Sequence, residues 1–132
     1  MKRTALAFVL VALIVSAYAG GAQAADTETL TGEFIWNNEG QSGEIEAIFT
    51  GTTDGHWDVA FHFIWEDEPH IWAGTAEGSL TDGDLKGSVI TDHESKGTFV
   101  FEGTFKDGKF TGTHASMRSG ERDDTGTMTL NR

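Results

Sequence analysis

The chain has 132 residues, of which 21 are acidic and 9 are lysine or arginine, so its formal net charge is −12. A surface this acidic repels phosphate backbones and anionic lipids, which argues against nucleic-acid binding. The absence of cysteine excludes disulfides and a cysteine-linked lipid anchor. A single domain of this length can be stabilised by its hydrophobic core alone.

The first residues have the composition of a secretory signal peptide. A short basic start precedes an apolar run at residues 5–15, which is too short to span a bilayer as a helix. Small residues follow, and cleavage after Ala24 leaves a polar N-terminus. We therefore expect a signal peptide at 1–24 and a single domain at 25–132, exported to the periplasm or the medium. An uncleaved N-terminal anchor is the alternative.

In the remaining chain, apolar and polar residues alternate, which is the period of β-strands. The clearest case is residues 56–65, where the rings of Trp57, Phe61 and Trp65 share one face and His62 lies on the other. The expected strands lie near residues 30–37, 44–50, 56–65, 72–80, 85–91, 99–105, 110–114 and 125–130.

Turn residues separate these segments and indicate hairpins. Asp-Gly pairs suit tight hairpins, and they occur at 54–55, 82–83 and 107–108. Residues 92–97 and 116–124 are expected to be looser connections. Residues 77–88 and 102–113 repeat the pattern Gly-x-apolar-x-Asp-Gly-x-apolar-x-Gly, so the repeating unit is a hairpin, and chained hairpins form a meander.

We therefore predict an all-β fold, a small up-and-down antiparallel meander of about eight strands that closes into a barrel and so removes its open edges. Glycines such as Gly32, Gly74 and Gly87 share the face of the aromatic rings, where a narrow interior has little room for side chains. A two-sheet β-sandwich is the alternative. An outer-membrane barrel is disfavoured because segments such as 85–91 are short for a membrane strand.

Aromatic residues from the first half of the expected domain gather on the inward face. They either pack the core or line an open cavity suited to a flat apolar or sugar-like ligand. The candidate lining residues are Trp36, Trp57, Phe61, Trp65, Trp72 and His114.

The other polar clusters match no catalytic, metal or cofactor motif. His114, on the inward face, could ligate haem iron, orient a ligand or simply bond to a backbone carbonyl. His56, Asp58 and His62 share an outward strand face, but their spacing is not that of a zinc site. The acidic run at 66–68 lacks the spacing of a calcium loop. We expect no catalytic residue, no metal site and no cofactor.

Residues 30–37, Leu-Thr-Gly-Glu-Phe-Ile-Trp-Asn, resemble the opening strand of avidin-type barrels, which begin with a Leu-Thr-Gly-x-Trp-like run followed by an Asn turn. The likeness covers eight residues and departs from the pattern at Phe34, with Trp36 two positions later. The resemblance implies a barrel fold. Tyr18 is the only tyrosine and lies in the expected signal peptide, so a donor of the avidin-type biotin site is missing and no binding residue is carried over.

The leading expectation is a non-enzymatic exported barrel that binds a small apolar or aromatic ligand in its interior. The alternative is an acidic protein-interaction or inhibitor module with a filled core. A third possibility is a barrel enzyme that uses His114, which requires an acid within hydrogen-bond reach of the imidazole. We expect no nucleic-acid partner and no membrane association after signal cleavage, and the sequence does not identify a protein partner.

Overall fold

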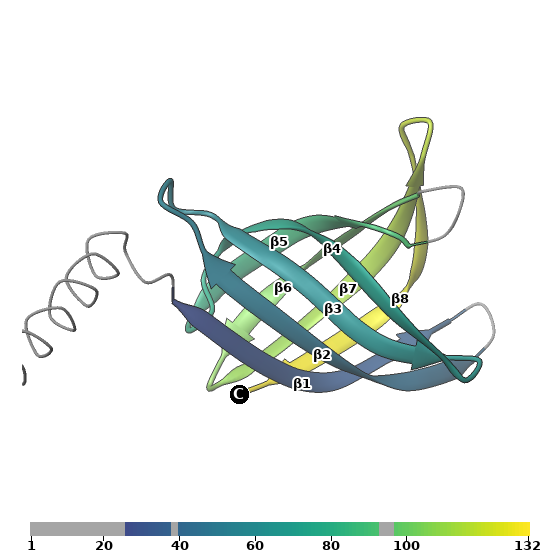
Figure 1. Cartoon of the computed structure of the whole chain (residues 1–132), viewed down its shortest axis with the longest axis horizontal. Helices are drawn as coiled ribbons and strands as arrows, with labels where there is room; N and C mark the ends of the chain where they lie inside the picture. Colours follow the sequence, from purple (N-terminus) through teal and green to yellow (C-terminus); the bar gives the residue numbers. More distant parts are fainter. Residues whose placement is uncertain (1–25, 38–39, 93–96) are drawn as a thin grey trace, which may run out of the picture.

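A computed structural model describes residues 26–37, 40–92 and 97–132. In this part of the chain, antiparallel strands pair in sequence order, and the last strand pairs with the first to close a barrel (Figure 1). The strands are β1 (Thr27–Trp36), β2 (Gln41–Gly51), β3 (Trp57–Trp65), β4 (Glu68–Gly78), β5 (Gly83–Ile90), β6 (Thr98–Lys106), β7 (Lys109–Arg118) and β8 (Glu121–Asn131).

The closed barrel confirms the all-β up-and-down meander, and the β-sandwich alternative is wrong. Closure is complete because β1 pairs with β8 from Thr31 opposite Asn131 to Trp36 opposite Gly126. The expected signal peptide lies outside the described residues. Among the residues that the structure describes, no helix is long and apolar enough to cross a membrane.

Alternate side chains of each strand point into the barrel and form its core, as the period of two predicts. The largest side chains with almost no solvent exposure are Leu30, Phe49, Leu85, Val89, Phe105, Phe110 and Leu130. Most of them lie in one half of the barrel, on the left in Figure 1, where the described chain begins and ends. We call this half the closed end.

Arg132 and the connection between β4 and β5 are in contact at the closed end. Leu80, between β4 and β5, is buried. Arg132 donates a hydrogen bond to the Leu80 carbonyl oxygen at 2.6 Å, and its guanidinium also pairs with the Glu28 carboxylate. The last residue of the chain therefore fastens β1 to the β4–β5 connection.

Glycine lets neighbouring strands approach closely at the inward positions. A Cβ atom on Gly32 would lie 1.8 Å from the Thr129 carbonyl oxygen, and one on Gly74 would lie 1.9 Å from the Ser88 carbonyl oxygen. At these two positions the backbone of the adjacent strand leaves no room for a side chain.

Two hairpins differ from the expected connections. Residues 116–124 are not a loose connection, because β7 continues to Arg118 and β8 begins at Glu121. Ser119 and Gly120 form the tight turn between them, with φ values of 50° and 83°. Apart from Met117, the strand extensions consist of polar and charged residues, so they carry no alternating apolar pattern. The β3–β4 turn is likewise tight and consists of Glu66 and Asp67.

Candidate ligand-binding cavity

The half of the barrel opposite the closed end is not filled. A cavity of about 220 Å³ lies inside this half, near the β3–β4 turn, and its lining is mostly apolar. We call this half the mouth. The aromatic lining residues include Trp36, Phe61, Phe63, Trp65, Trp72 and Phe99.

The rings of the mouth support one another. The Trp72 ring centroid lies 4.6 Å from that of Phe99, and the Trp36 centroid lies 5.6 Å from Phe99. Phe63 meets Trp72 edge-on at 5.0 Å. Because each ring contacts its neighbours along the wall, the cavity is formed before any ligand enters.

Five of the six residues that the sequence suggested line the cavity: Trp36, Phe61, Trp65, Trp72 and His114.

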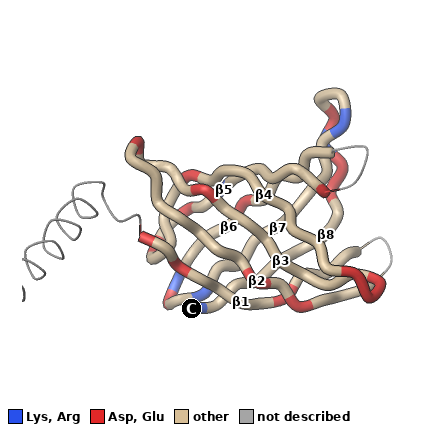
Figure 2. Tube along the Cα trace, in the orientation of Figure 1, with Lys and Arg blue, Asp and Glu red and all other residues tan. Residues whose placement is uncertain are grey.

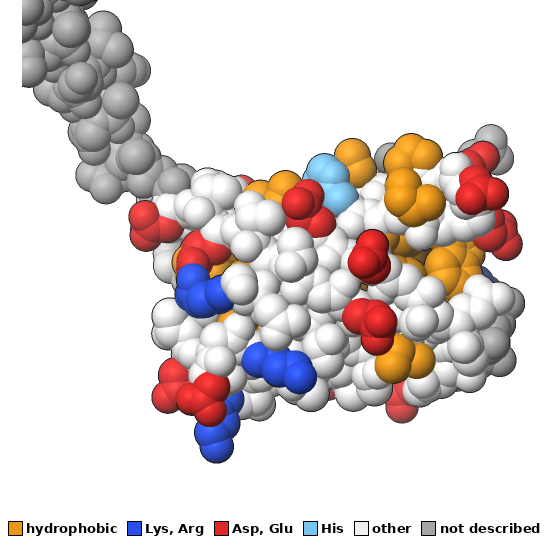
Figure 3. All heavy atoms as spheres, turned by 90° about the horizontal axis from the view of Figure 1, so that it is seen from below, with side chains coloured by type: hydrophobic (Ala, Val, Ile, Leu, Met, Phe, Trp, Pro, Cys, Tyr) orange, Lys and Arg blue, Asp and Glu red, His pale blue; other side chains and the backbone are white. Residues whose placement is uncertain are grey.

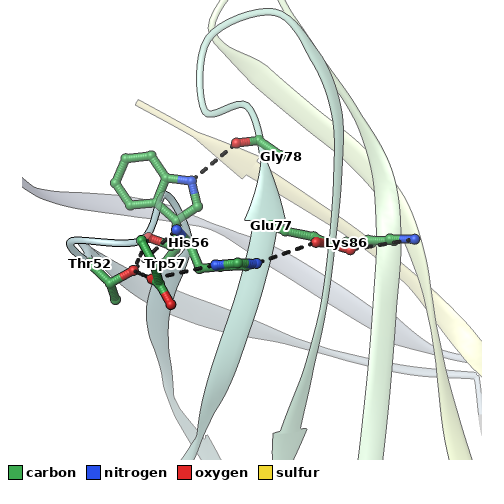
Figure 4. A network of polar contacts seen from close by, with 7 residues as sticks. Thr52, His56, Trp57, Glu77, Gly78 and Lys86 are labelled. Atoms are coloured by element: carbon green, nitrogen blue, oxygen red, sulfur yellow. Dashed lines mark hydrogen bonds and ion pairs between the residues drawn. The ribbon is translucent and has the colours of Figure 1, made fainter.

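Trp57 does not, because it begins β3 at the closed end whereas Trp65 ends β3 at the mouth. The Trp57 indole N–H donates a hydrogen bond to the Gly78 carbonyl oxygen at 3.1 Å (Figure 4), and its ring packs edge-on against Phe49. Trp57 therefore helps to fill the core.

His114 is buried in the cavity wall, and both of its ring nitrogens face hydrogen-bond partners in that wall. Nε2 lies 3.2 Å from the Ile35 carbonyl oxygen, and Nδ1 lies 2.6 Å from the Thr125 hydroxyl. Burial lowers the pKa of His114, opposed by hydrogen bonds to the backbone of Ile35 and Thr127, which favours the neutral ring. The Thr125 hydroxyl also donates a hydrogen bond to the His114 backbone carbonyl oxygen at 3.0 Å, and the tautomer of the ring sets which of its nitrogens donates. The geometry directs neither nitrogen toward a bound iron or substrate.

A carboxylate that sequence reasoning missed lies at the rim of the cavity. Asp92 accepts hydrogen bonds from His70 Nδ1 at 3.0 Å, from the Ile71 backbone N–H at 3.1 Å and from the Trp72 indole N–H at 3.1 Å. Partial burial raises the pKa of Asp92, but these hydrogen bonds outweigh it and bring the pKa to about 2. No local pattern could reveal this carboxylate, because its partners lie on another strand.

Among the described residues, His56, Asp58 and His62 form no metal site. The His56 imidazole lies 3.4 Å from Asp54 and 3.6 Å from Glu77, and Glu77 also pairs with Lys86 (Figure 4). These contacts join the β2–β3 connection to β4 and β5. Across residues 26–37, 40–92 and 97–132, no three His, Asp or Glu side chains come together in a way that could hold a metal ion.

Comparisons of the chain with protein-family models, with curated protein sequences and with solved structures gave no match.

Proposed function

We propose that this chain is an exported, non-enzymatic binding protein that holds a small apolar or aromatic ligand in the mouth of its barrel. The observation that carries the proposal is the division of the interior. The closed end is packed with fully buried side chains, whereas the mouth keeps a cavity of about 220 Å³ between aromatic rings. A preformed apolar cavity with few polar groups is the usual form of a small-molecule site.

The cavity volume limits the size of the ligand. An apolar cavity of about 150 Å³ is enough to hold benzene, and sites for drug-sized molecules begin at about 300 Å³. The volume of about 220 Å³ therefore suits one aromatic ring with a short chain. It is too small for haem.

Two indole donors in the lining are available to a polar group on such a ligand. Neither Trp36 nor Trp65 donates a side-chain hydrogen bond to any other residue that the structure describes. Both line the cavity, and both are partly exposed. The site therefore favours a ring that carries one hydrogen-bond acceptor over a pure hydrocarbon.

Titration of the tryptophan fluorescence with phenylpropanol, a neutral ring with a short polar chain, tests the proposal. Val89 is buried and lines the cavity, so Val89→Phe fills part of the volume. Ile90 is the next residue of β5 and is exposed, so Ile90→Phe makes a matched change outside the barrel.

We expect a saturable fluorescence change that is preserved in Ile90→Phe and weakened about tenfold or more in Val89→Phe, because the added ring occupies the ligand's space. Equal binding by both variants, or no saturable change in the parent protein, would show that the cavity is not the site.

A second candidate function, a protein-interaction module, is favoured by an apolar patch on the outer surface. Ile64, Ile71 and Ile90 are each more than half exposed, and the pairing of β3, β4 and β5 places them diagonally next to one another. On the face drawn in Figure 3, hydrophobic side chains also reach the surface among acidic ones. Exposed apolar patches mark interaction surfaces. Ile71→Glu should then abolish any association that sedimentation detects.

A further inference from the structure

The rim of the cavity carries a carboxylate that is held in one place. Asp92 lies beside His70 and Trp72, which both line the cavity, and it accepts a hydrogen bond from each of them. A backbone N–H from Ile71 holds the second carboxylate oxygen. A ligand that extends out of the cavity at this point therefore meets a carboxylate that is already held in position.

The turns around the mouth have the same sign of charge. The acidic residues at the β3–β4 turn are Glu66, Asp67 and Glu68, and those near the β7–β8 turn, which extends beyond the core, are Glu121, Asp123 and Asp124. Figure 2 shows the acidic cluster at the β3–β4 turn. The described cations near these turns are Arg118 and Arg122, and Arg122 is already paired with Glu102 and Asp124. Charges of one sign around an apolar opening raise the local concentration of the opposite ion.

The aromatic lining favours the same sign of ligand charge. The faces of aromatic rings, and of tryptophan above all, attract cations. Three indoles, those of Trp36, Trp65 and Trp72, line the cavity. An anionic ligand would be repelled by the rim and would gain nothing from the ring faces, whereas a neutral one would gain only from burial.

From this arrangement we infer that the ligand is a small arylalkyl ammonium ion, whose ring enters the aromatic cavity and whose cationic group lies at the mouth beside Asp92. This inference rests on the proposed function and adds the charge of the ligand to it. The ring supplies apolar burial, and the ammonium group supplies a charge-assisted contact with the rim.

Three compounds of nearly equal size and different charge test the inference: phenylpropylammonium, phenylpropanol and phenylpropionate. Tryptophan fluorescence should show the ammonium ion binding about tenfold more tightly than the alcohol, with the carboxylate weakest, since a partly solvated charge pair is worth about that factor. Added salt should reduce the preference for the ammonium ion and leave the alcohol unaffected.

Asp92→Asn should remove most of the preference for the cation and leave the affinity for the alcohol nearly unchanged. Asp84→Asn is the matched control, because Asp84 is an exposed acid of β5 near the closed end, and it should keep the full preference. If Asp92→Asn disturbs the fold, the triple variant Glu66→Gln, Asp67→Asn, Glu68→Gln lowers the charge of the mouth without touching the Asp92 hydrogen bonds. This triple variant should reduce the preference for the ammonium ion over the alcohol at least twofold.

Equal affinity for the alcohol and the ammonium ion would overturn the inference about charge and leave the cavity as a binding site. The same holds if neither Asp92→Asn nor the triple variant changes the preference. Failure of all three compounds to bind would instead overturn the proposed function, and the inference with it.

Discussion

His114 and Asp92 show how their surroundings set the charge of two groups near the same cavity. His114 is buried in the wall, and this burial outweighs its hydrogen bonds, so its neutral form is favoured. Asp92 is surrounded by hydrogen-bond donors and reaches solvent, so its charged form is favoured. The difference leaves an uncharged interior behind a negatively charged rim.

The depressed pKa of His114 predicts how the free energy of unfolding depends on pH. The unfolded chain takes up a proton near the ordinary pKa of about 6.5, whereas the folded protein resists that proton. Stability is therefore complete above this pH and is lost as the pH falls toward the lower folded pKa. Urea unfolding of the parent protein and of His114→Gln checks this between about pH 7.5 and about pH 5, a range that brackets the reference value of about 6.5.

The difference in unfolding free energy between the two proteins should shrink as the pH falls, because only the parent protein loses stability through protonation of His114 in the unfolded chain. At pH 7.5 the variant should be less stable by about 1–3 kcal/mol, since it disturbs buried hydrogen bonds. A difference that stays constant over this pH range would contradict the account of His114.

Asp92 predicts a separate loss of stability in acid. Its pKa of about 2 lies below the ordinary value, so its contribution is complete above about pH 4 and is lost as the pH falls toward 2. Solvent screening at this exposed carboxylate keeps the contribution to about 1 kcal/mol or less. At neutral pH, Asp92→Asn should therefore be less stable than the parent protein. Near pH 2, about the folded pKa, the two proteins should have nearly the same free energy of unfolding. An unchanged stability of the variant at neutral pH would contradict the hydrogen-bond network.

At the scale of elements, the β3–β4 turn stores backbone strain. Glu66 and Asp67 have φ values of 53° and 65°, a region that costs residues other than glycine about 1 kcal/mol each. Asn-Gly is the preferred pair in a two-residue hairpin of this kind. Glu66→Asn combined with Asp67→Gly should therefore stabilise the protein by about 1–2 kcal/mol, measured by urea unfolding.

The control Glu66→Gln removes one charge and keeps the backbone preference, so it should change the stability by less than about 0.5 kcal/mol. If the Asn-Gly variant is no more stable than this control, the turn is not strained.

The strands show which elements a sequence pattern can locate. The alternation of apolar and polar residues predicted every strand of the barrel body, because one face of each strand must be buried. It failed between residues 116 and 124, where β7 and β8 extend beyond the core as a polar hairpin. Such a hairpin is specified by backbone pairing and by the Ser119-Gly120 turn, and neither leaves an apolar pattern.

At the scale of the whole molecule, the proposed function assigns stability to the closed end of the barrel and ligand binding to the mouth. Phe105 is completely buried at the closed end, so Phe105→Ala should lower the free energy of unfolding by about 3–5 kcal/mol. Phe99 lines the cavity and is only partly buried, so Phe99→Ala should cost about 1–2 kcal/mol. Urea unfolding compares them directly, and equal losses would contradict the division.

The sequence could predict which residue types line the candidate site, but not at which end of the barrel each residue lies. Alternation places Trp57 and Trp65 on the same face of β3, and both do point inward. However, they are separated by about 26 Å along the strand, and only the paired barrel shows that Trp57 lies at the closed end and Trp65 at the mouth. Asp92 could not be predicted because its role depends on β4 residues that lie far from it in sequence.

The central claim is that the mouth half of the barrel holds an open cavity that takes a small ring, while the closed end does not. The four tryptophans give four indole N–H signals in a nitrogen–proton correlation spectrum, and titration with phenylpropanol tests the claim directly. The signals of Trp36, Trp65 and Trp72 should shift and saturate, while that of Trp57 stays in place because Trp57 lies at the closed end and does not line the cavity. Shifts of equal size at all four indoles, or at none, would contradict it.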